Sequence, residues 1–404
     1  MTTTVETTAS GRPPTTDALA TTLAPVEAPK TRYYLIDGLR GVAALLVVLH
    51  HFYNETAGSI RDAVAVILPR PIEWVIERGT AGVDIFFIIS GFVIALSVGR
   101  SRVTPRYFAN FALRRSLRLD PPYWTAILLS LAIAVVGDKV MKRPIVLPTW
   151  DGLLANMTYL QNILRYPRLV FVSWTLVHEI QFYLLFIGLL ALAQRASPGS
   201  GRGGDPAPLW WFACFGATGL ASLFWPSTGL RFQQAWCVNT WYLFSAGVFC
   251  YLLFSKKIGP WLALAYLGPV CVVLLSNPNP HSVTAVLTLA LLLVASRAGG
   301  MEGWLTAAPL QYLGRISYSL YLIHWPIGNR LLNLGAKYQH GSTLRGVAMF
   351  VGACAISILA AEALHRLVEA PSMRLARRLK PRPSTGERRP WRLPWRAQAF
   401  GWWT

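Results

Sequence analysis

Ionisable residues stand at both ends of an apolar stretch that covers residues 36–54. Asp37 and Arg40 lie near its start, and His50 and His51 lie near its end. A charge inside a membrane span is costly, so such residues indicate a function and require a partner. At about 100° per residue, Arg40 and His51 share one face of a helix, about 16 Å apart along its axis, and His50 lies off that face. The alternative is that Arg40 extends to the membrane interface and the histidines only end the helix.

A carboxylate lies within a second apolar stretch, at Glu179 in the run V-S-W-T-L-V-H-E-I-Q-F-Y. Inside a membrane this side chain needs a partner or a proton. Counting residues from the predicted ends of the spans places it at the depth of His51. A histidine can act as a general base near neutral pH, and a carboxylate can orient its ring. The sequence therefore predicts that His51 removes a proton and that Glu179 orients it.

Basic residues gather at the other depth. Arg115 and Arg118 are three positions apart on one helical face, just before a predicted span and on the same side as Arg40 and Arg315. They could instead be anchors of the kind that cytoplasmic connections carry. The polar residues thus form two layers, a basic layer on the cytoplasmic side and a layer of histidine and carboxylate residues, including His51 and Glu179, farther out. Such an arrangement suits a long ligand with an anionic head at the cytoplasmic face and a reactive end deep in the bundle.

Three further polar residues fall inside predicted spans. Asp84 is expected to cap a helix or to hydrogen-bond within the bundle, and Ser90 to ease helix packing beside Gly91. His324 falls at middle or outer depth. No metal site is predicted, because the sequence has no spacing typical of one, and the five cysteines are interpreted as small packing residues.

The composition indicates where these residues act. The chain has 404 residues, of which 53% are hydrophobic and 14% charged, and its mean hydropathy is +0.40. These values exclude a soluble domain of this size and indicate a polytopic membrane protein. Lysine and arginine number 38 against 18 acidic residues. They fall in connections between apolar runs and in the C-terminal tail, where they are topology signals, so a nucleic-acid partner is not expected.

Runs of about 20 apolar residues predict an all-α membrane bundle of about ten transmembrane helices. These runs cover residues 36–55, 79–98, 120–137, 172–194, 208–226, 236–255, 259–276, 281–297, 312–334 and 343–367.

Three regions follow from this pattern. Residues 1–32 are predicted to be a disordered cytoplasmic tail, residues 33–370 the transmembrane domain, and residues 371–404 a basic cytoplasmic tail. Both termini are therefore placed in the cytoplasm. The connection 138–171 should lie outside, and its length and amphipathic stretch suggest that it lies on the outer surface or folds back over the bundle.

Several motifs occur in a characteristic order between residues 34 and 371. They are D-G-L-R-G from Asp37 with H-F at His51, G-V-D-I-F-F-I-I-S-G-F from Gly82, R-R-S-L-R-L from Arg114 with P-Y-W at Pro122, S-W-T-L-V-H-E-I-Q-F-Y from Ser173, L-G-R-I-S-Y-S-L-Y-L-I-H-W-P from Leu313, and V-E-A-P from Val368. On these motifs the chain resembles the acyltransferase-3 family of integral membrane acyltransferases. Members of this family decorate surface polysaccharides, lipopolysaccharide, peptidoglycan and some secreted small molecules.

The resemblance implies roles for individual residues. Arg40 and His51 would be the family's essential arginine–histidine pair, Arg115 and Arg118 its R-x-x-R pair at the cytoplasmic face, and Glu179 its glutamate before F-Y. The other candidate site residues at motif positions are Asp37, Asp84, Ser90, Trp174, Ser317, Tyr318 and His324.

Two departures from the family pattern bear on these roles. Thr175 replaces a serine but keeps the hydroxyl, and Asp120 with Pro121 leaves the orientation of Arg118 open. Some members also carry an extracytoplasmic hydrolase-like domain. The short stretch after the last predicted span leaves no room for one, so none is expected in this chain.

The resemblance implies a membrane-bound O-acyltransferase of the bacterial cytoplasmic (inner) membrane. It would move an acyl group, with acetyl as our first choice, from cytoplasmic acyl-CoA to a hydroxyl of an exported or lipid-linked glycan. Acyl-CoA would be the donor substrate, and no permanently bound cofactor is expected. The alternatives are a covalent acyl-His51 relay, an acceptor that is a secreted small molecule or glycosylated metabolite, and a glycan transporter or flippase without acyl chemistry.

Overall fold

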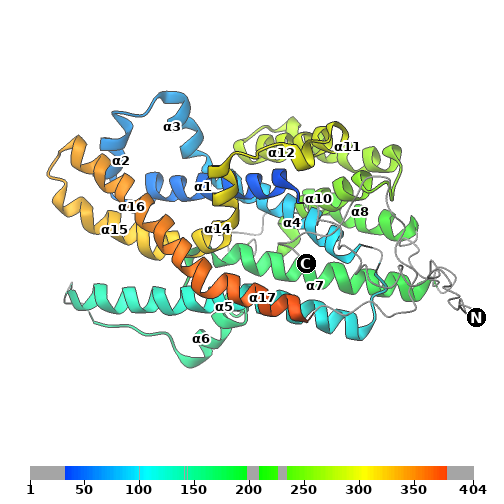
Figure 1. Ribbon diagram of the computed structural model, residues 1–404, viewed down its shortest axis with the longest axis horizontal. Helices are drawn as coiled ribbons and strands as arrows, with labels where there is room; N and C mark the ends of the chain where they lie inside the picture. Colours follow the sequence, from blue (N-terminus) through cyan, green and yellow to red (C-terminus); the bar gives the residue numbers. More distant parts are fainter. Residues whose placement is uncertain are drawn as a thin grey trace, which may run out of the picture.

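The computed structural model describes residues 32–99, 101–140, 142, 144–197, 209–225 and 234–379. Within these ranges the regular structure is helical and includes no strand (Figure 1). The all-α prediction is therefore confirmed. The predicted N-terminal tail, apart from Arg32, and most of the predicted C-terminal tail lie outside the described residues.

Helices coincide with every predicted span. They are α1 (Tyr34–Asn54), α4 (Gly82–Val98), α5 (Pro105–Val140), α7 (Trp174–Ala196), α8 (Leu209–Leu223), α10 (Trp241–Phe254), α11 (Pro260–Ser276), α12 (Pro280–Ala298), α14 (Ala308–His324) continued by α15 (Arg330–Gly335), and α16 (Thr343–Leu364). In the described chain, 7 helical stretches are long and apolar enough to cross a membrane, and α8 and α11 are shorter apolar helices. A helical membrane bundle is thus confirmed, and the number of ten spans stays a prediction.

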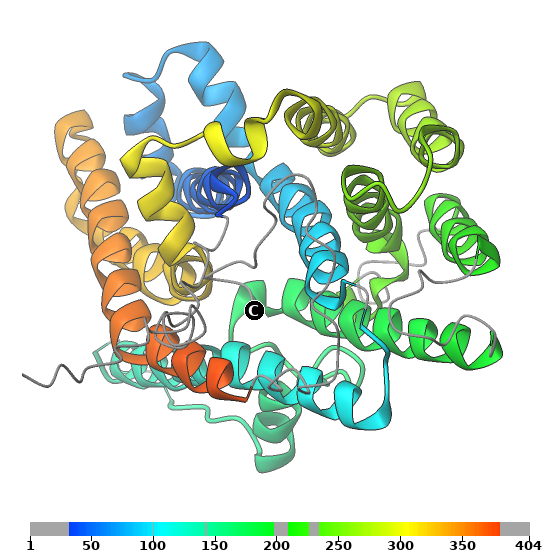
Figure 2. The same cartoon turned by 45° about the vertical axis from the view of Figure 1, so that its right-hand side comes forward.

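Helix α1 lies between α14 and α4, and Figure 2 shows it there in dark blue. The α1–α14 contact is close because glycines face it. A Cβ atom on Gly314 would lie 2.1 Å from the carbonyl oxygen of Asp37, and one on Gly41 would lie 2.6 Å from that of Leu310. Such backbone approach requires residues without a side chain. This contact fixes Arg40, one residue before Gly41, relative to α14.

A second pair of glycines brings α4 against α10. A Cβ on Gly91 would lie 1.9 Å from the carbonyl oxygen of Phe244, and one on Gly247 would lie 1.9 Å from that of Ile88. The close packing that the sequence suggested around Ser90 is therefore made by Gly91, and the Ser90 hydroxyl has another partner, described below.

Gly91→Ala is expected to destabilise the protein, because the added methyl group forces α4 and α10 apart. Overpacking of this kind costs about 1–3 kcal/mol, and the melting temperature of the purified protein in detergent measures it. Gly188→Ala in α7 is the matched control, since nothing lies within 4 Å of its added Cβ. The control should melt at the wild-type temperature or slightly above it. Equal melting temperatures for the two variants would contradict the close contact.

The third predicted span begins earlier than the sequence suggested. Helix α5 is continuous over 36 residues and contains Pro121 and Pro122 in its interior. The predicted span started at residue 120 because the apolar run starts there, whereas the helix extends through the basic residues before it and through both prolines, although proline usually ends or kinks a helix. The prolines have no N–H group and interrupt the backbone hydrogen bonds of the helix. The hydroxyl of Thr125 donates to the carbonyl of Pro121 at 2.8 Å and so satisfies one backbone group near this interruption. Arg115 and Arg118 consequently lie within one long helix.

The connection after α5 folds back, as one of the two predicted alternatives had it. It contains the short helix α6 (Trp150–Met157) and returns to α7. The indole of Trp124 donates to the carbonyl of Met157 at 3.1 Å, and the hydroxyl of Tyr159 donates to Asp120 at 2.8 Å. These contacts hold the connection against α5, in the lower part of Figure 1.

The ninth predicted span, 312–334, contains Pro326, and the structure has a widened turn at this proline. Helix α14 passes through a π-helical turn (Trp325–Asn329) into α15. A π turn accommodates the missing N–H of proline without ending the helix. His324 is therefore the last α-helical residue before this turn, which contacts α1.

The end of the helical domain also differs from the prediction, which placed the start of the tail at residue 371. A second π-helical turn (His365–Glu369) joins α16 to α17 (Ala370–Arg378), and α17 packs against α5. Residues 371–378 thus belong to the bundle. At the other end of the structure, α2 (Gly58–Ala65) and α3 (Arg70–Glu77) follow α1 and lie at the upper left of Figure 1.

Candidate active site

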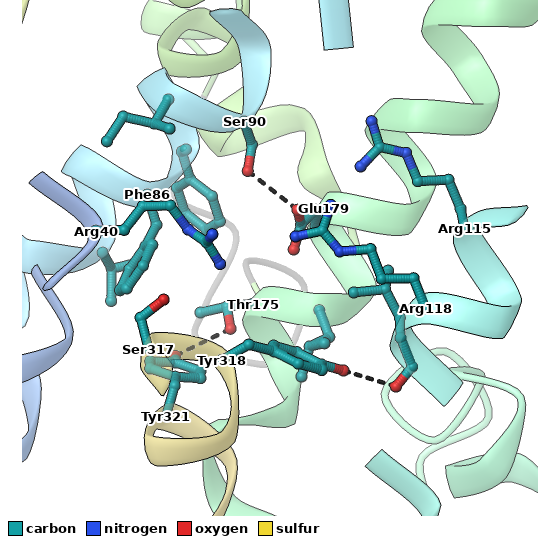
Figure 3. A pocket seen from close by; sticks show the side chains of 15 residues that line it. Arg40, Phe86, Ser90, Arg115, Arg118, Thr175, Glu179, Ser317, Tyr318 and Tyr321 are labelled. Atoms are coloured by element: carbon teal, nitrogen blue, oxygen red, sulfur yellow. Dashed lines mark hydrogen bonds between the residues drawn. The ribbon is translucent and has the colours of Figure 1, made fainter. Parts of the chain in front are cut away.

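A pocket lies where α1, α4, α5, α7 and α14 meet (Figure 3). It is lined by Arg40, Val83, Phe86, Phe87, Ile89, Ser90, Arg115, Arg118, Leu119, Thr175, Leu176, Glu179, Ser317, Tyr318 and Tyr321. The lining has three arginines and one carboxylate, so it favours a ligand that carries negative charge. The remaining walls are largely apolar and aromatic, which suits a ligand with a neutral arm.

The three arginines reach this pocket from two helices. Arg40 comes from α1, and Arg115 and Arg118 come from α5, as the predicted basic layer requires. In Figure 3, Arg40 and Arg118 extend into the pocket from opposite sides. Arg115 stands 4.5 Å from the ring centroid of Tyr183. Arg315, which we assigned to the same layer, instead pairs with Glu362 on α16 at 3.4 Å and does not line the pocket.

Glu179 belongs to this arginine pocket. Its Oε1 atom accepts a hydrogen bond from the Ser90 hydroxyl at 3.0 Å and another from the Tyr183 hydroxyl. Ser90 therefore orients Glu179 and is not merely a packing residue. The predicted pairing of Glu179 with His51 is wrong, because the ring of His51 has a different partner.

That partner is His324. The Nδ1 atom of His51 lies 2.9 Å from Nε2 of His324, and the two rings are nearly parallel, at 7°. Both side chains are buried, His51 at 8% exposure and His324 at 0%. The rings of Phe171 and Trp325 stand at right angles to His51, with centroids 5.8 and 5.2 Å away. His51 itself does not line the arginine pocket.

Tyr321 connects the arginine pocket to the histidine pair. Its ring lines the pocket, its hydroxyl is 2.9 Å from that of Thr175, and its ring centroid lies 6.0 Å from that of His324. The pair thus lies next to the pocket wall, on the side away from Arg40 along α1. The predicted order along α1, with arginine at one end and histidine at the other, is the order that the structure has.

The hydroxyls of α14 fix the pocket's geometry. Tyr318 donates to the carbonyl of Leu119 at 2.8 Å, one residue after Arg118, and so ties α14 to α5. Ser317 donates to the carbonyl of Gly314 within its own helix at 2.9 Å. Both line the pocket, as expected for candidate site residues.

Residues 33–362 match the model of the acyltransferase domain. The chain belongs to the acyltransferase-3 family. It is therefore a membrane-bound O-acyltransferase. No solved structure gives a significant match.

Relatives in this family share much of the chain. Acyltransferase MdmB of Streptomyces mycarofaciens is 28% identical over 388 residues, which are 86% of this chain and 93% of that protein. The putative membrane-bound transacylase BcsY of Komagataeibacter xylinus is 29% identical over 350 residues, 80% of each protein. The putative peptidoglycan O-acetyltransferase YrhL of Bacillus subtilis is 25% identical over 343 residues, which are 72% of this chain and 48% of that protein.

Three acyltransferase-3 motif residues lie away from the pocket. Asp37 accepts from Arg32 at 2.9 Å near the start of α1. Asp84 lies 2.7 Å from Nδ1 of His281 and so hydrogen-bonds between α4 and α12, as one prediction had it. Trp174 packs on Phe87, with ring centroids 6.3 Å apart. The structure assigns these three residues contacts within the bundle.

Several polar groups of this acyltransferase were not among the predicted site residues. Tyr183 holds Glu179, and Tyr321 joins the pocket to the histidine pair. Both lie inside the motifs, and Tyr183 is four residues after Glu179, a spacing that places the two on one helix face. Glu369 was also missed. It is 2% exposed and bonds Ser319 Oγ at 2.6 Å and His365 Nδ1 at 3.0 Å.

Proposed function

We propose that the chain transfers an acyl group from acyl-CoA to a hydroxyl of an exported or lipid-linked glycan, with acetyl-CoA as the first choice of donor. The observation that carries this proposal is the arginine pocket next to the buried pair of His51 and His324. CoA carries a diphosphate and a further phosphate group, so its binding site requires several cations in one place. Guanidinium groups bind phosphates by two parallel hydrogen bonds. The pocket offers Arg40, Arg115 and Arg118.

The shape of the donor fits the order of these groups. The phosphates of CoA would lie among the arginines, and the pantetheine arm would run along the apolar and aromatic wall past Tyr321. Arg40 and His51 are about 16 Å apart along α1, which a pantetheine arm can span. This geometry supports a donor that enters from the arginine side, which we assign to the cytoplasm from the arginines at the start of α5.

His51 would act as the general base. Its ring takes the proton of the acceptor hydroxyl while the oxygen attacks the thioester carbonyl. The new carbon–oxygen bond forms, the carbon–sulfur bond breaks, and the proton passes to the departing sulfur. A positioned base typically contributes about 10²–10⁴-fold to the rate. The covalent alternative, in which His51 first accepts the acyl group, uses the same residue.

The acceptor class rests on the relatives. Proteins named for peptidoglycan O-acetylation and for exopolysaccharide production resemble parts of this chain. A glycan hydroxyl, reached from the His51 end, is accordingly our proposal.

Purified protein in lipid nanodiscs tests the reaction. The substrates are radiolabelled acetyl-CoA and an undecaprenyl-linked oligosaccharide. We expect the thiol of CoA to be released only when the acceptor is present. The label should appear on the sugar as an ester that base treatment removes. Surface glycans of a deletion strain should lose the corresponding ester by mass spectrometry. If no acceptor leads to release of the CoA thiol, the proposed acyl transfer is overturned. If the label is transferred only to a secreted small molecule, the glycan acceptor is overturned.

Glu179→Gln should change the binding of the acyl-CoA donor and leave the proposed base, His51, unaffected. Glutamine can keep the hydrogen bonds to Ser90 and Tyr183 but removes a negative charge from the site proposed for phosphates. We expect the KM for acetyl-CoA to fall by about three- to tenfold, the scale of one partly screened charge. The pH dependence of kcat should stay that of the wild type, since Glu179 does not contact His51. A rise in KM, or a shifted pH profile, would contradict this assignment.

A further inference from the structure

The hydrogen bond between His51 and His324 has a direction that its surroundings determine. Nδ1 of His324 lies 3.1 Å from the carbonyl oxygen of Leu320, one turn earlier on α14. A carbonyl only accepts, so the hydrogen is on Nδ1 of His324. A neutral imidazole carries one N–H group, and Nε2 of His324 is therefore an acceptor.

The same reasoning continues to His51. Its Nδ1 lies 2.9 Å from the accepting Nε2 of His324, and the nearly parallel rings allow an in-plane N–H···N bond. Nδ1 of His51 must therefore donate. Its remaining nitrogen, Nε2, then carries a lone pair and has no hydrogen-bonding partner within the described residues.

The surroundings favour a neutral pair. In the part of the chain that the structure describes, no carboxylate contacts either ring, and both side chains are buried. The aromatic rings of Phe171 and Trp325 pack edge-on against His51. The low polarity around the rings disfavours an imidazolium in the resting protein.

We propose that His324 is a positioning residue that sets the tautomer of His51 and so selects Nε2 as the reacting nitrogen. This inference deepens the proposed function and rests on it for the role of His51. When Nε2 takes the acceptor's proton, the Nδ1–H group of the new imidazolium stays bonded to His324, which stabilises the charge as the reaction proceeds. In the covalent alternative, Nε2 would be the nitrogen that carries the acyl group.

Nuclear magnetic resonance of the wild type tests the tautomer directly. The protein is labelled with ¹⁵N-histidine and placed in nanodiscs, and the His51 signals are assigned by their loss in His51→Ala. We expect a protonated Nδ1 and an unprotonated Nε2 on His51. A protonated Nε2 with a bare Nδ1 would overturn the inference, even if acyl transfer is confirmed. Conversely, failure of thioester cleavage would overturn the proposed function and leave this readout intact.

Two substitutions at His324 test its role in the reaction. In His324→Gln the amide oxygen can occupy the place of Nε2 and accept from His51, so kcat should stay within about tenfold of the wild type. In His324→Phe no acceptor remains, and kcat should fall about 10²–10³-fold while the KM for acetyl-CoA stays unchanged. The His51 signals should show the wild-type tautomer in the glutamine variant and a mixture in the phenylalanine variant. Equal kcat losses in two variants with wild-type melting temperatures would overturn the positioning role.

Discussion

His51→Ala should lower kcat for acetyl transfer by about 10²–10⁴-fold, because the substitution removes the proposed base and leaves the acceptor hydroxyl protonated. The KM for acetyl-CoA and the affinity for CoA should stay at wild-type values. His51 lies about three helical turns from Arg40 on α1, and it does not line the arginine pocket. Initial rates in nanodiscs and CoA titration by calorimetry measure the two quantities.

His50→Ala is the matched control for this change. His50 is the neighbouring imidazole, but its Nδ1 lies 3.3 Å from the carbonyl oxygen of Ile76 and 3.0 Å from the amide nitrogen of Asn54. It faces α3 and not His324, so its loss should leave kcat within a few fold of the wild type. Loss of CoA binding in His51→Ala would count against the division of roles. Labelled acyl trapped on wild-type protein without acceptor, and absent from His51→Ala, would favour the covalent relay.

The sequence predicted the fold well because the signals are local. An apolar run of about 20 residues must satisfy its backbone internally in a membrane, so it predicts a helix wherever it occurs. The errors fall where other contacts override a local rule. Pro121 and Pro122 are tolerated within α5, and Pro326 is absorbed by a π-helical turn. Neighbouring groups that satisfy the backbone are not visible in a single run of residues.

Several residues that line the arginine pocket were among the predicted site residues, whereas the partners of His51 and Glu179 were not predicted. Helical geometry placed Arg40 and His51 on one face, and charge placed Arg115 and Arg118 in the same layer as Arg40. Depth alone, however, could not choose between Glu179 and another group as the partner of His51. Depth fixes position along a helix axis, whereas rotation about that axis decides which residues meet.

The correct partner was among the candidate residues. His324 was placed at middle or outer depth, and the close glycine contact between α1 and α14 brings it to His51. Glu179, in contrast, is held toward the arginines by Ser90 on α4. The pairing therefore depends on which helices are neighbours, and that information comes from long-range packing that the motifs do not contain.

Replacing both Arg115 and Arg118 by glutamine should weaken CoA binding about 10²–10⁴-fold. A charge-assisted hydrogen bond contributes about 1.5–3 kcal/mol, and about 1.4 kcal/mol corresponds to a factor of ten in affinity. Two such residues therefore give a loss of this size. Arg114→Gln is the matched control, because Arg114 is the adjacent arginine on α5, donates to the carbonyl of Asn110 at 3.3 Å, and does not line the pocket.

A substrate without phosphates distinguishes phosphate binding from a structural role. Acetyl-pantetheine has the thioester and the arm of acetyl-CoA but lacks its nucleotide and phosphates. The Arg115→Gln/Arg118→Gln variant should use it with the wild-type kcat/KM, because the arm and the histidine pair are unchanged. The variant should at the same time lose most of its preference for acetyl-CoA over acetyl-pantetheine. Equal losses with both substrates would mean that the arginines hold α5 in place, since the thioester would then reach His51 poorly whether or not phosphates are present.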